Sequence, residues 1–137
     1  MAVPRPPLRE EPPPQWEPAG EGALMRRMVE GPGAELILYR IPPGTRFELH
    51  THPNSELGVI LSGEGDLLLQ DTRRSVRPGD SFFIPPGTAH GFAVPAKGEQ
   101  VVILNADVDV PKDAVEVQSV VRSGDLAPRR PRRVDER

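Results

Sequence analysis

Short apolar segments alternate with turn-forming residues through the middle of the chain. Between residues 24 and 104, runs rich in Val, Ile, Leu and Phe are separated by Gly and Pro, and no window shows a long helical period. Short strands at a spacing of roughly ten residues are typical of an antiparallel sandwich or barrel. A short helix near residues 113–117 is possible, although this segment also fits a strand. The predicted strands are Leu36–Ile41, Phe47–His52, Leu57–Leu61, Leu67–Gln70, Ser75–Arg77, Phe82–Ile84, His90–Val94 and Val101–Leu104.

The two ends of the chain depart from this pattern. Residues 1–20 contain seven prolines, which exclude a helix and favour polyproline II or disorder. This segment is either a loose tail or an arm that packs Trp16, the only tryptophan, on the barrel or on a second subunit. Residues 127–137 contain five Arg and two acids. A solvated end is expected there, although a basic tail can also bind phosphate.

These differences predict three regions. We expect a proline-rich N-terminal arm over residues 1–22, a β-barrel over residues 23–122 and a disordered basic tail over residues 123–137. No internal repeat is visible, so one barrel is predicted and not a tandem pair.

Composition removes several classes of function. A chain of 137 residues is long enough for one domain with a core. No apolar run of about 18 residues predicts a membrane span, and the first residues do not resemble a secretory signal, so the cytoplasm is the expected compartment. A net charge of −3 gives no reason to expect a nucleic-acid partner. The absence of cysteine excludes disulfides, thiolate ligands and cysteine nucleophiles.

The three histidines of the chain form a candidate metal site together with one glutamate. His50 and His52 are two residues apart, so on a strand both project to the same face. A turn-prone Pro-Asn-Ser follows and would bring Glu56 to the inward face of the next strand. His90 comes from a distant strand, after a Pro-Pro-Gly turn. Each residue alone has a plainer explanation, since an isolated H-x-H is common on surface strands and a single Glu is usually solvated.

Taken together, the four residues predict one divalent transition metal ion. Imidazole nitrogens with a carboxylate oxygen suit Fe, Mn, Ni, Cu and Zn, so the pattern does not choose among these metals. An octahedral ion with four protein ligands would keep two positions open for water, dioxygen or a bidentate substrate.

The two segments resemble the two motifs of the cupin superfamily. The first motif, G-x5-H-x-H-x3,4-E-x6-G, is met at every specified position: Gly44, His50, His52, Glu56 and Gly63. The second, G-x5-P-x-G-x2-H-x3-N, is met at Gly79, Pro85, Gly87 and His90, and departs from it at Val94, where the family pattern has Asn. The resemblance covers about residues 35–105. It implies an antiparallel jelly-roll β-barrel with the metal inside, in a small single-domain protein that commonly forms a homodimer.

The alternation of side chains along a strand also predicts which neighbours of His50 face inward. On a regular strand Arg46 and Glu48 share the inward face of His50, whereas Phe47 and Leu49 face the other layer. Glu48 is therefore a candidate catalytic residue, either as a general base or by holding a ligand histidine through its second nitrogen. The alternative is a carboxylate at the rim of the barrel, paired with Arg46.

The same reasoning predicts the walls of a pocket. Gly58 and Ile60 share the face of Glu56, and Gly58 could leave room for a substrate, although it could equally reflect a twisted strand. Phe92 has the parity of His90, and Phe82 has that of Ile84, so these side chains are candidate apolar walls. Ordinary core packing is the plainer interpretation for each of them. Such walls would suit a small organic molecule and not a sugar phosphate.

The resemblance does not imply one reaction, because cupins include enzymes of several kinds as well as binding and regulatory domains. The complete ligand set predicts a metal-dependent oxygenase-type enzyme that acts on a small organic substrate in the barrel. The alternative is a non-catalytic cupin that binds a metal or a small molecule. A third possibility is a barrel that is metal-free or holds zinc only as a structural ion.

Overall fold

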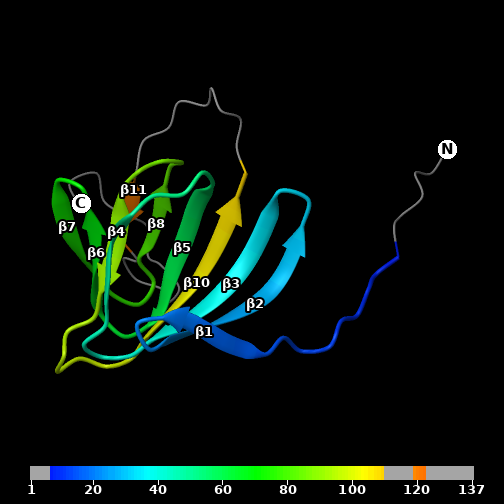
Figure 1. Ribbon diagram of the computed structural model, residues 1–137, viewed down its shortest axis with the longest axis horizontal. Coiled ribbons are helices and arrows are strands. Elements are labelled where there is room, and N and C mark those ends of the chain that lie inside the picture. The colour runs from blue at the N-terminus through cyan, green and yellow to red at the C-terminus, as the bar shows by residue number, and fades with distance from the viewer. Residues whose placement is uncertain (1–6, 110–118, 123–137) are drawn as a thin grey trace, which may run out of the picture.

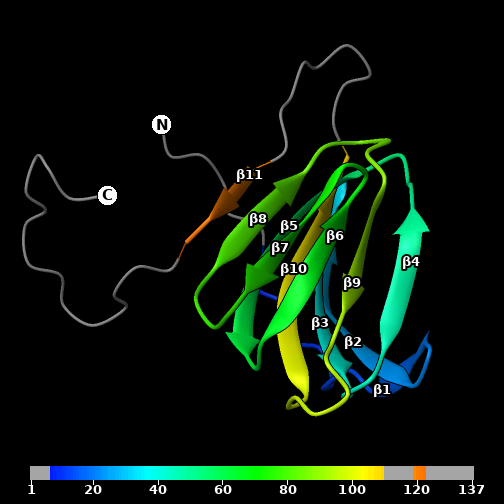
Figure 2. The same cartoon turned by 90° about the vertical axis from the view of Figure 1, so that its left-hand side faces the viewer.

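The computed structural model of the protein describes residues 7–109 and 119–122. Every regular element in this part of the chain is a strand, and the strands form two antiparallel sheets that face each other (Figures 1 and 2). The predicted all-β jelly-roll architecture is confirmed. The strands are β1 Trp16–Gly20, β2 Ala23–Gly31, β3 Ala34–Ile41, β4 Arg46–His50, β5 Ser55–Ser62, β6 Gly65–Leu69, β7 Thr72–Val76, β8 Ser81–Ile84, β9 His90–Ala93, β10 Val101–Val108 and β11 Ser119–Val121.

The two sheets differ in size. The larger has seven strands in the order β1-β2-β3-β10-β5-β8-β11, and the smaller has four in the order β4-β9-β6-β7. Neighbours in these orders are often distant in sequence, as when β10 pairs with both β3 and β5. This crossing between the two sheets brings the strand that ends at His50 beside the strand that begins at His90.

The core lies between the inner faces of the two sheets. Along β10 the residues alternate, with Val101, Ile103 and Asn105 buried and the residues between them partly exposed. The other strands contribute in the same way, because successive side chains of a strand point to opposite faces. The buried cluster comprises Ala23, Ile41, Ile60, Leu67, Leu69, Val76, Phe82, Ile84, Phe92, Val94, Val101 and Ile103.

The sheet begins earlier than the predicted boundary at residue 23. β1 pairs with β2 from Trp16 onward and forms an edge of the larger sheet. Pro18 is tolerated within β1 because an edge strand does not need every N–H group for the ladder. The prediction of an arm that extends to residue 22 is therefore wrong for residues 16–22, which belong to the barrel.

Trp16 packs on the barrel, as one of the two sequence-based alternatives expected. The guanidinium carbons of Arg40 and Arg26 lie 5.0 and 5.8 Å from the centre of its ring, in the range of cation–π contacts. Arg26 also donates a hydrogen bond of 2.9 Å from Nε to the carbonyl of Pro14. These contacts hold the end of the proline-rich segment against the outer face of the larger sheet.

Two predictions lie outside the described residues: the possible short helix near residues 113–117 and the disordered tail over residues 123–137. Within the described part of the chain, no helix is long and apolar enough to cross a membrane.

Candidate metal centre

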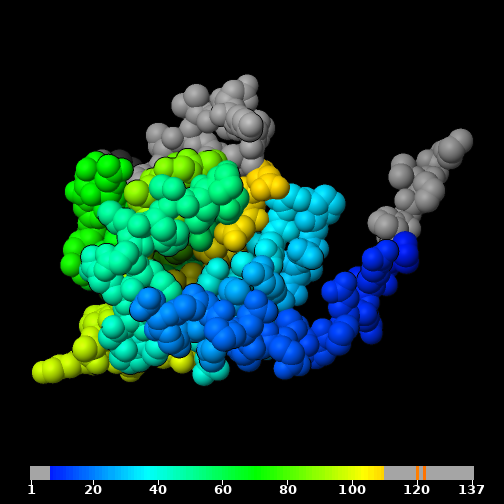
Figure 3. Space-filling view, viewed as in Figure 1, coloured from blue at the N-terminus to red at the C-terminus, as the bar shows by residue number. Residues whose placement is uncertain are grey.

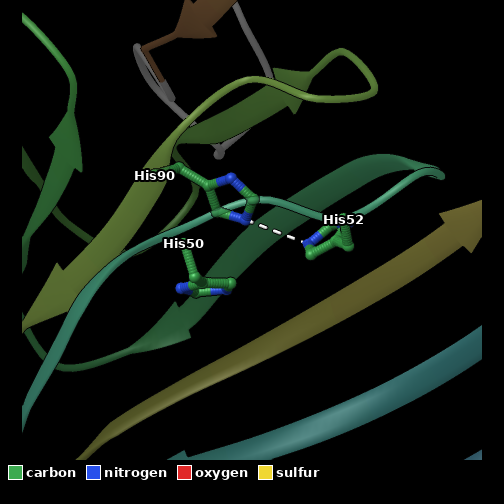
Figure 4. Close-up of side chains that lie close together, drawn as sticks. All are labelled: His50, His52 and His90. Atoms are coloured by element: carbon green, nitrogen blue, oxygen red, sulfur yellow. Dashed lines mark hydrogen bonds between the residues drawn. The ribbon is translucent and has the colours of Figure 1, made fainter.

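The three histidines come together between the two sheets. His50 ends β4, His52 lies in the connection that follows, and His90 begins β9 opposite His50. Figure 4 shows the three rings turned toward one another. One nitrogen from each ring lies within 4.8 Å of those of the other two, a grouping that can hold a metal ion.

Glu56, on the neighbouring β5, adds a carboxylate on one side of this group. Its Oε2 atom lies 2.8 Å from His90 Nε2 and 3.7 Å from His52 Nε2, and the two imidazole Nε2 atoms are 3.1 Å apart. At metal–ligand bonds of about 2.1 Å, adjacent ligands of one ion are separated by about 3.0–3.4 Å. The separation of His52 and His90 falls in this range, whereas Glu56 is close to His90 but farther from His52. The group that can hold a metal ion is therefore the three histidines, with Glu56 as an adjacent carboxylate.

Backbone carbonyls orient two of the rings. His50 Nδ1 lies 2.9 Å from the carbonyl oxygen of Glu48, and His90 Nδ1 lies 2.8 Å from that of Thr88. A carbonyl only accepts, so in both rings Nδ1 carries the hydrogen and Nε2 keeps its lone pair when the ring is neutral. A ligand histidine is commonly fixed in this way by its second nitrogen.

The contact between His90 and Glu56 shifts the pKa values of both groups. Burial by itself would raise the pKa of Glu56, but the hydrogen bond from His90 and the charges of His90 and His52 outweigh it and lower that pKa. Burial would lower the pKa of His90, but hydrogen bonds to Glu56 and Thr88 raise it. Both shifts favour the charged forms of the two groups, whose Nε2 and Oε2 atoms are 2.8 Å apart. A metal ion that binds to Nε2 must displace the proton of His90, so its affinity depends on pH.

Glu48 does not face the histidines, and the prediction that it shares their inward face is wrong. β4 carries an irregularity: Phe47 pairs with Phe92 and His50 with His90, so three steps along β4 match two along β9. The extra residue shifts the alternation, as β-bulges do. Phe47 consequently packs against the core, whereas Glu48 points outward.

The surroundings of Glu48 are those of a rim carboxylate. Its side chain is 74% exposed, and its Oε1 accepts a hydrogen bond of 2.7 Å from Arg46 Nε. This arrangement is the alternative that the sequence left open. The contribution of residue 48 to the site comes from its backbone carbonyl, which orients His50.

A cavity of about 190 Å³ adjoins the histidines. Its lining includes Phe82 and Phe92 together with His50, His90 and Glu56. In Figure 3 the surface is hollowed between the N-terminal strands, in blue, and the segment around β4, in blue-green. The remaining lining residues are Ala19, Tyr39, Ile41, Phe47, Leu67, Gly91, Ile103 and Asn105.

Three predicted pocket residues do not line this cavity. Ile60 and Ile84 are buried at 1% exposure in the core cluster, which is the plainer interpretation given above. Gly58 is covered by the ring of Phe82, because a Cβ atom at residue 58 would lie 2.6 Å from Cε1 of that ring. The absence of a side chain at Gly58 thus makes room for Phe82 and not for a substrate.

Among the lining residues that sequence reasoning did not predict, Phe47, Tyr39 and Asn105 are the most informative. Phe47 was assigned to the wrong face because the bulge cannot be read from the pattern. Tyr39 lies in the cavity wall, although the apolar pattern of its strand does not say which sheet face it occupies. Asn105 was overlooked, although a signal exists: it continues the alternation of Val101 and Ile103, so a polar residue occupies an inward position.

Comparison with known proteins now decides the family. The sequence profile of the cupin domain matches residues 37–107, which is just over half of the chain. This chain belongs to the cupin family. The matched segment includes all four residues of the candidate metal centre.

Two curated relatives share this segment. The cupin is 31% identical to H2HPP isomerase of Bacillus subtilis over 78 residues, which cover 56% of this chain and 31% of that protein. It is 32% identical to the uncharacterized protein MJ1618 of Methanocaldococcus jannaschii over 76 residues, which cover 51% of this chain and 61% of that protein. The matched segment thus spans 31% and 61% of the length of these two relatives.

Solved structures confirm the fold. An RmlC-like cupin from Shewanella frigidimarina aligns with a TM-score of 0.65 at 20% identity, over 73% of this chain and 87% of that one. The polyketide cyclase RemF from Streptomyces resistomycificus aligns with a TM-score of 0.61 at 20% identity, over 84% of both chains. At this level of identity the likeness shows the fold alone, and cupins of this fold have varied functions.

Proposed function

We propose that His50, His52, His90 and Glu56 bind one divalent transition metal ion, and that the cupin is an oxygenase-type enzyme acting on a small organic substrate in the adjoining cavity. The observation that carries this proposal is the convergence of three histidine nitrogens at the wall of a mostly apolar cavity, with the carboxylate of Glu56 beside two of them. A bound ion would supply a Lewis acid with open coordination positions.

The walls of the cavity support a narrower substrate class. The rings of Phe47, Phe82 and Phe92 form much of the wall, and no Lys or Arg is among the described residues that line it. The nearby cations Arg26 and Arg40 contact Trp16 instead. A dianion such as oxalate would find no basic side chain to neutralise it. An apolar or aromatic molecule with an enol or phenol oxygen to bind the ion fits this environment.

Oxygen consumption tests the proposal. Protein stripped of metal would be reconstituted without oxygen, separately with Fe(II), Mn(II), Ni(II) and Cu(II), and then supplied with oxygen and a panel of enolic and phenolic compounds. We expect oxygen uptake with at least one metal and one compound, and none with the His50→Ala/His52→Ala variant. Absence of turnover in every combination would contradict an oxygenase.

A second candidate function is isomerisation without oxygen. The 31% identity to a protein named H2HPP isomerase favours it, and so does the 2.8 Å contact between His90 and Glu56, two groups at the cavity wall that can exchange a proton. Transfer of deuterium from solvent into a substrate analogue, with no oxygen uptake, would support this candidate over the first. A co-purified molecule that is held and never altered would instead indicate the non-catalytic binding module.

The homodimer and the cytoplasmic location remain predictions, as does the absence of a nucleic-acid or membrane partner. The outer face of the larger sheet exposes Leu57 and Leu61, at 43% and 49%, and a second copy would cover them. Light scattering of the purified protein would measure the subunit number, and a monomer at micromolar concentration would contradict the dimer.

A further inference from the structure

Two acidic side chains lie on neighbouring strands next to the histidines. Glu56 on β5 and Asp107 on β10 are directly opposite each other in the antiparallel pairing of these strands. Like charges in such a cross-strand pair repel each other. A hydrogen-bond donor that contacts both carboxylates reduces this repulsion.

Asn105 is that donor. It is 3% exposed, and its Nδ2 atom lies 3.1 Å from Glu56 Oε1 and 3.2 Å from Asp107 Oδ1. An ionised carboxylate only accepts hydrogen bonds, so two carboxylates fix which end of the amide faces them. The two hydrogens on Nδ2 match the two acceptors. Asp107 thus holds the Asn105 amide in the orientation that Glu56 requires.

Because of this hydrogen bond from Asn105, the two carboxylate oxygens of Glu56 have different contacts. Oε1 accepts from Asn105, whereas Oε2 faces His90 and His52 at 2.8 and 3.7 Å. We infer that Asn105 is a positioning residue, which engages one oxygen of Glu56 so that the carboxylate offers the other, Oε2, to a metal ion. This inference rests on the proposed metal site, and it concerns a residue outside both sequence motifs.

Cobalt(II) binding tests the inference, because cobalt absorbs visible light in a way that reports its ligands. Asn105→Leu keeps the approximate size of the side chain and removes both donors. Partners that orient a metal ligand typically change affinity by about 10- to 100-fold when removed. We expect the dissociation constant for cobalt to increase at least tenfold in Asn105→Leu, and the absorption spectrum of the bound cobalt to change. Val102→Ala, on the same strand but on its opposite, partly exposed face, is the matched control and should bind as the wild type does.

The same substitution made in a Glu56→Ala variant distinguishes a positioning role of Asn105 from a merely structural one. In the Glu56→Ala variant there is no carboxylate to orient, so adding Asn105→Leu should not weaken cobalt binding further. Asp107→Asn, which keeps the shape of the side chain, should weaken binding less than Asn105→Leu and should also have no effect without Glu56. It provides the same test if Asn105→Leu does not fold.

The outcomes are distinguishable. Wild-type affinity in Asn105→Leu, or an equal loss with and without Glu56, would overturn the role of Asn105 while leaving the metal site intact. Failure of the wild-type protein itself to bind cobalt would overturn the proposed site, and the inference with it.

Discussion

Gly58 is the position where the packing of the cavity wall can be tested most sharply. A Cβ atom added at residue 58 would lie 2.6 Å from Cε1 and 2.9 Å from Cε2 of Phe82, and closer still to Cζ. Carbon atoms in contact are normally about 3.5–4.0 Å apart. The ring of Phe82 must therefore move by about 1 Å in Gly58→Ala, and the neighbouring cavity is the space into which it can move.

Two opposing terms set the expected stability. Overpacking a well-filled core typically costs about 1–3 kcal/mol. Replacing Gly by Ala in a strand recovers about 0.5–1 kcal/mol, because the unfolded chain loses conformational freedom. Gly58 has no positive φ, so the backbone adds no strain of its own. The clash involves most of one ring edge, so we expect a net loss of about 1–2 kcal/mol in the free energy of unfolding.

Urea unfolding of a double-mutant cycle measures this coupling. Phe82→Leu removes the ring edge that meets the new Cβ atom, so Gly58→Ala should cost nothing in the Phe82→Leu background and could stabilise it slightly. The coupling free energy expected between the two sites is about 1–3 kcal/mol. If Gly58→Ala were neutral with Phe82 present, or cost the same in both backgrounds, Phe82 would not be what occupies the space above Gly58.

Two further predictions follow from the described contacts. Burial and the charges of Asp107 and Glu56 raise the pKa of Tyr39 to about 12. Because Tyr39 is the only tyrosine, the phenolate absorbance of the folded protein should titrate near that value and not near 10, with the Tyr39→Phe variant as the control. The free energy of unfolding should fall as the pH rises from about 10, the pKa of tyrosine in the unfolded chain, toward 12. A midpoint near 10 in folded protein would contradict the buried placement. Asp80, whose side chain is 1% exposed, accepts 3.0 Å hydrogen bonds from Arg77 N and from Arg122 Nη1. Asp80→Ala should therefore lower the free energy of unfolding by about 1–3 kcal/mol, whereas Arg122→Ala, at the half-exposed end of the pair, should lower it by less than about 1 kcal/mol. Equal losses for the two variants in urea unfolding would contradict this asymmetry.

Much of the fold could be predicted from the sequence, because apolar alternation and Gly-Pro turns mark the strands directly. The grouping of the histidines was equally accessible, since His50 and His52 are close in sequence and the second motif specifies His90. Both rest on local spacing, which a chain shows without reference to its tertiary structure.

The features that the sequence could not predict depend on contacts between strands that are distant in the chain. The irregularity between Phe47 and His50 reverses the faces of Phe47 and Glu48, and strict alternation cannot foresee an extra residue. Gly58 was open to two interpretations because the ring that covers it comes from β8, a different strand. Asn105 gains its place only when β10 pairs with β5 and brings it beside Glu56.

The metal content of purified protein tests the central proposal most directly. The change to compare is His50→Ala/His52→Ala, and Glu48→Gln is the matched control, since it lies on the same strand but points outward to Arg46. After loading with a divalent transition metal and removal of the excess, elemental analysis should find about one ion per chain in the wild type and in the control. The double variant should hold essentially none. Equal metal in the double variant and the wild type would show that the ion binds elsewhere and would contradict the site.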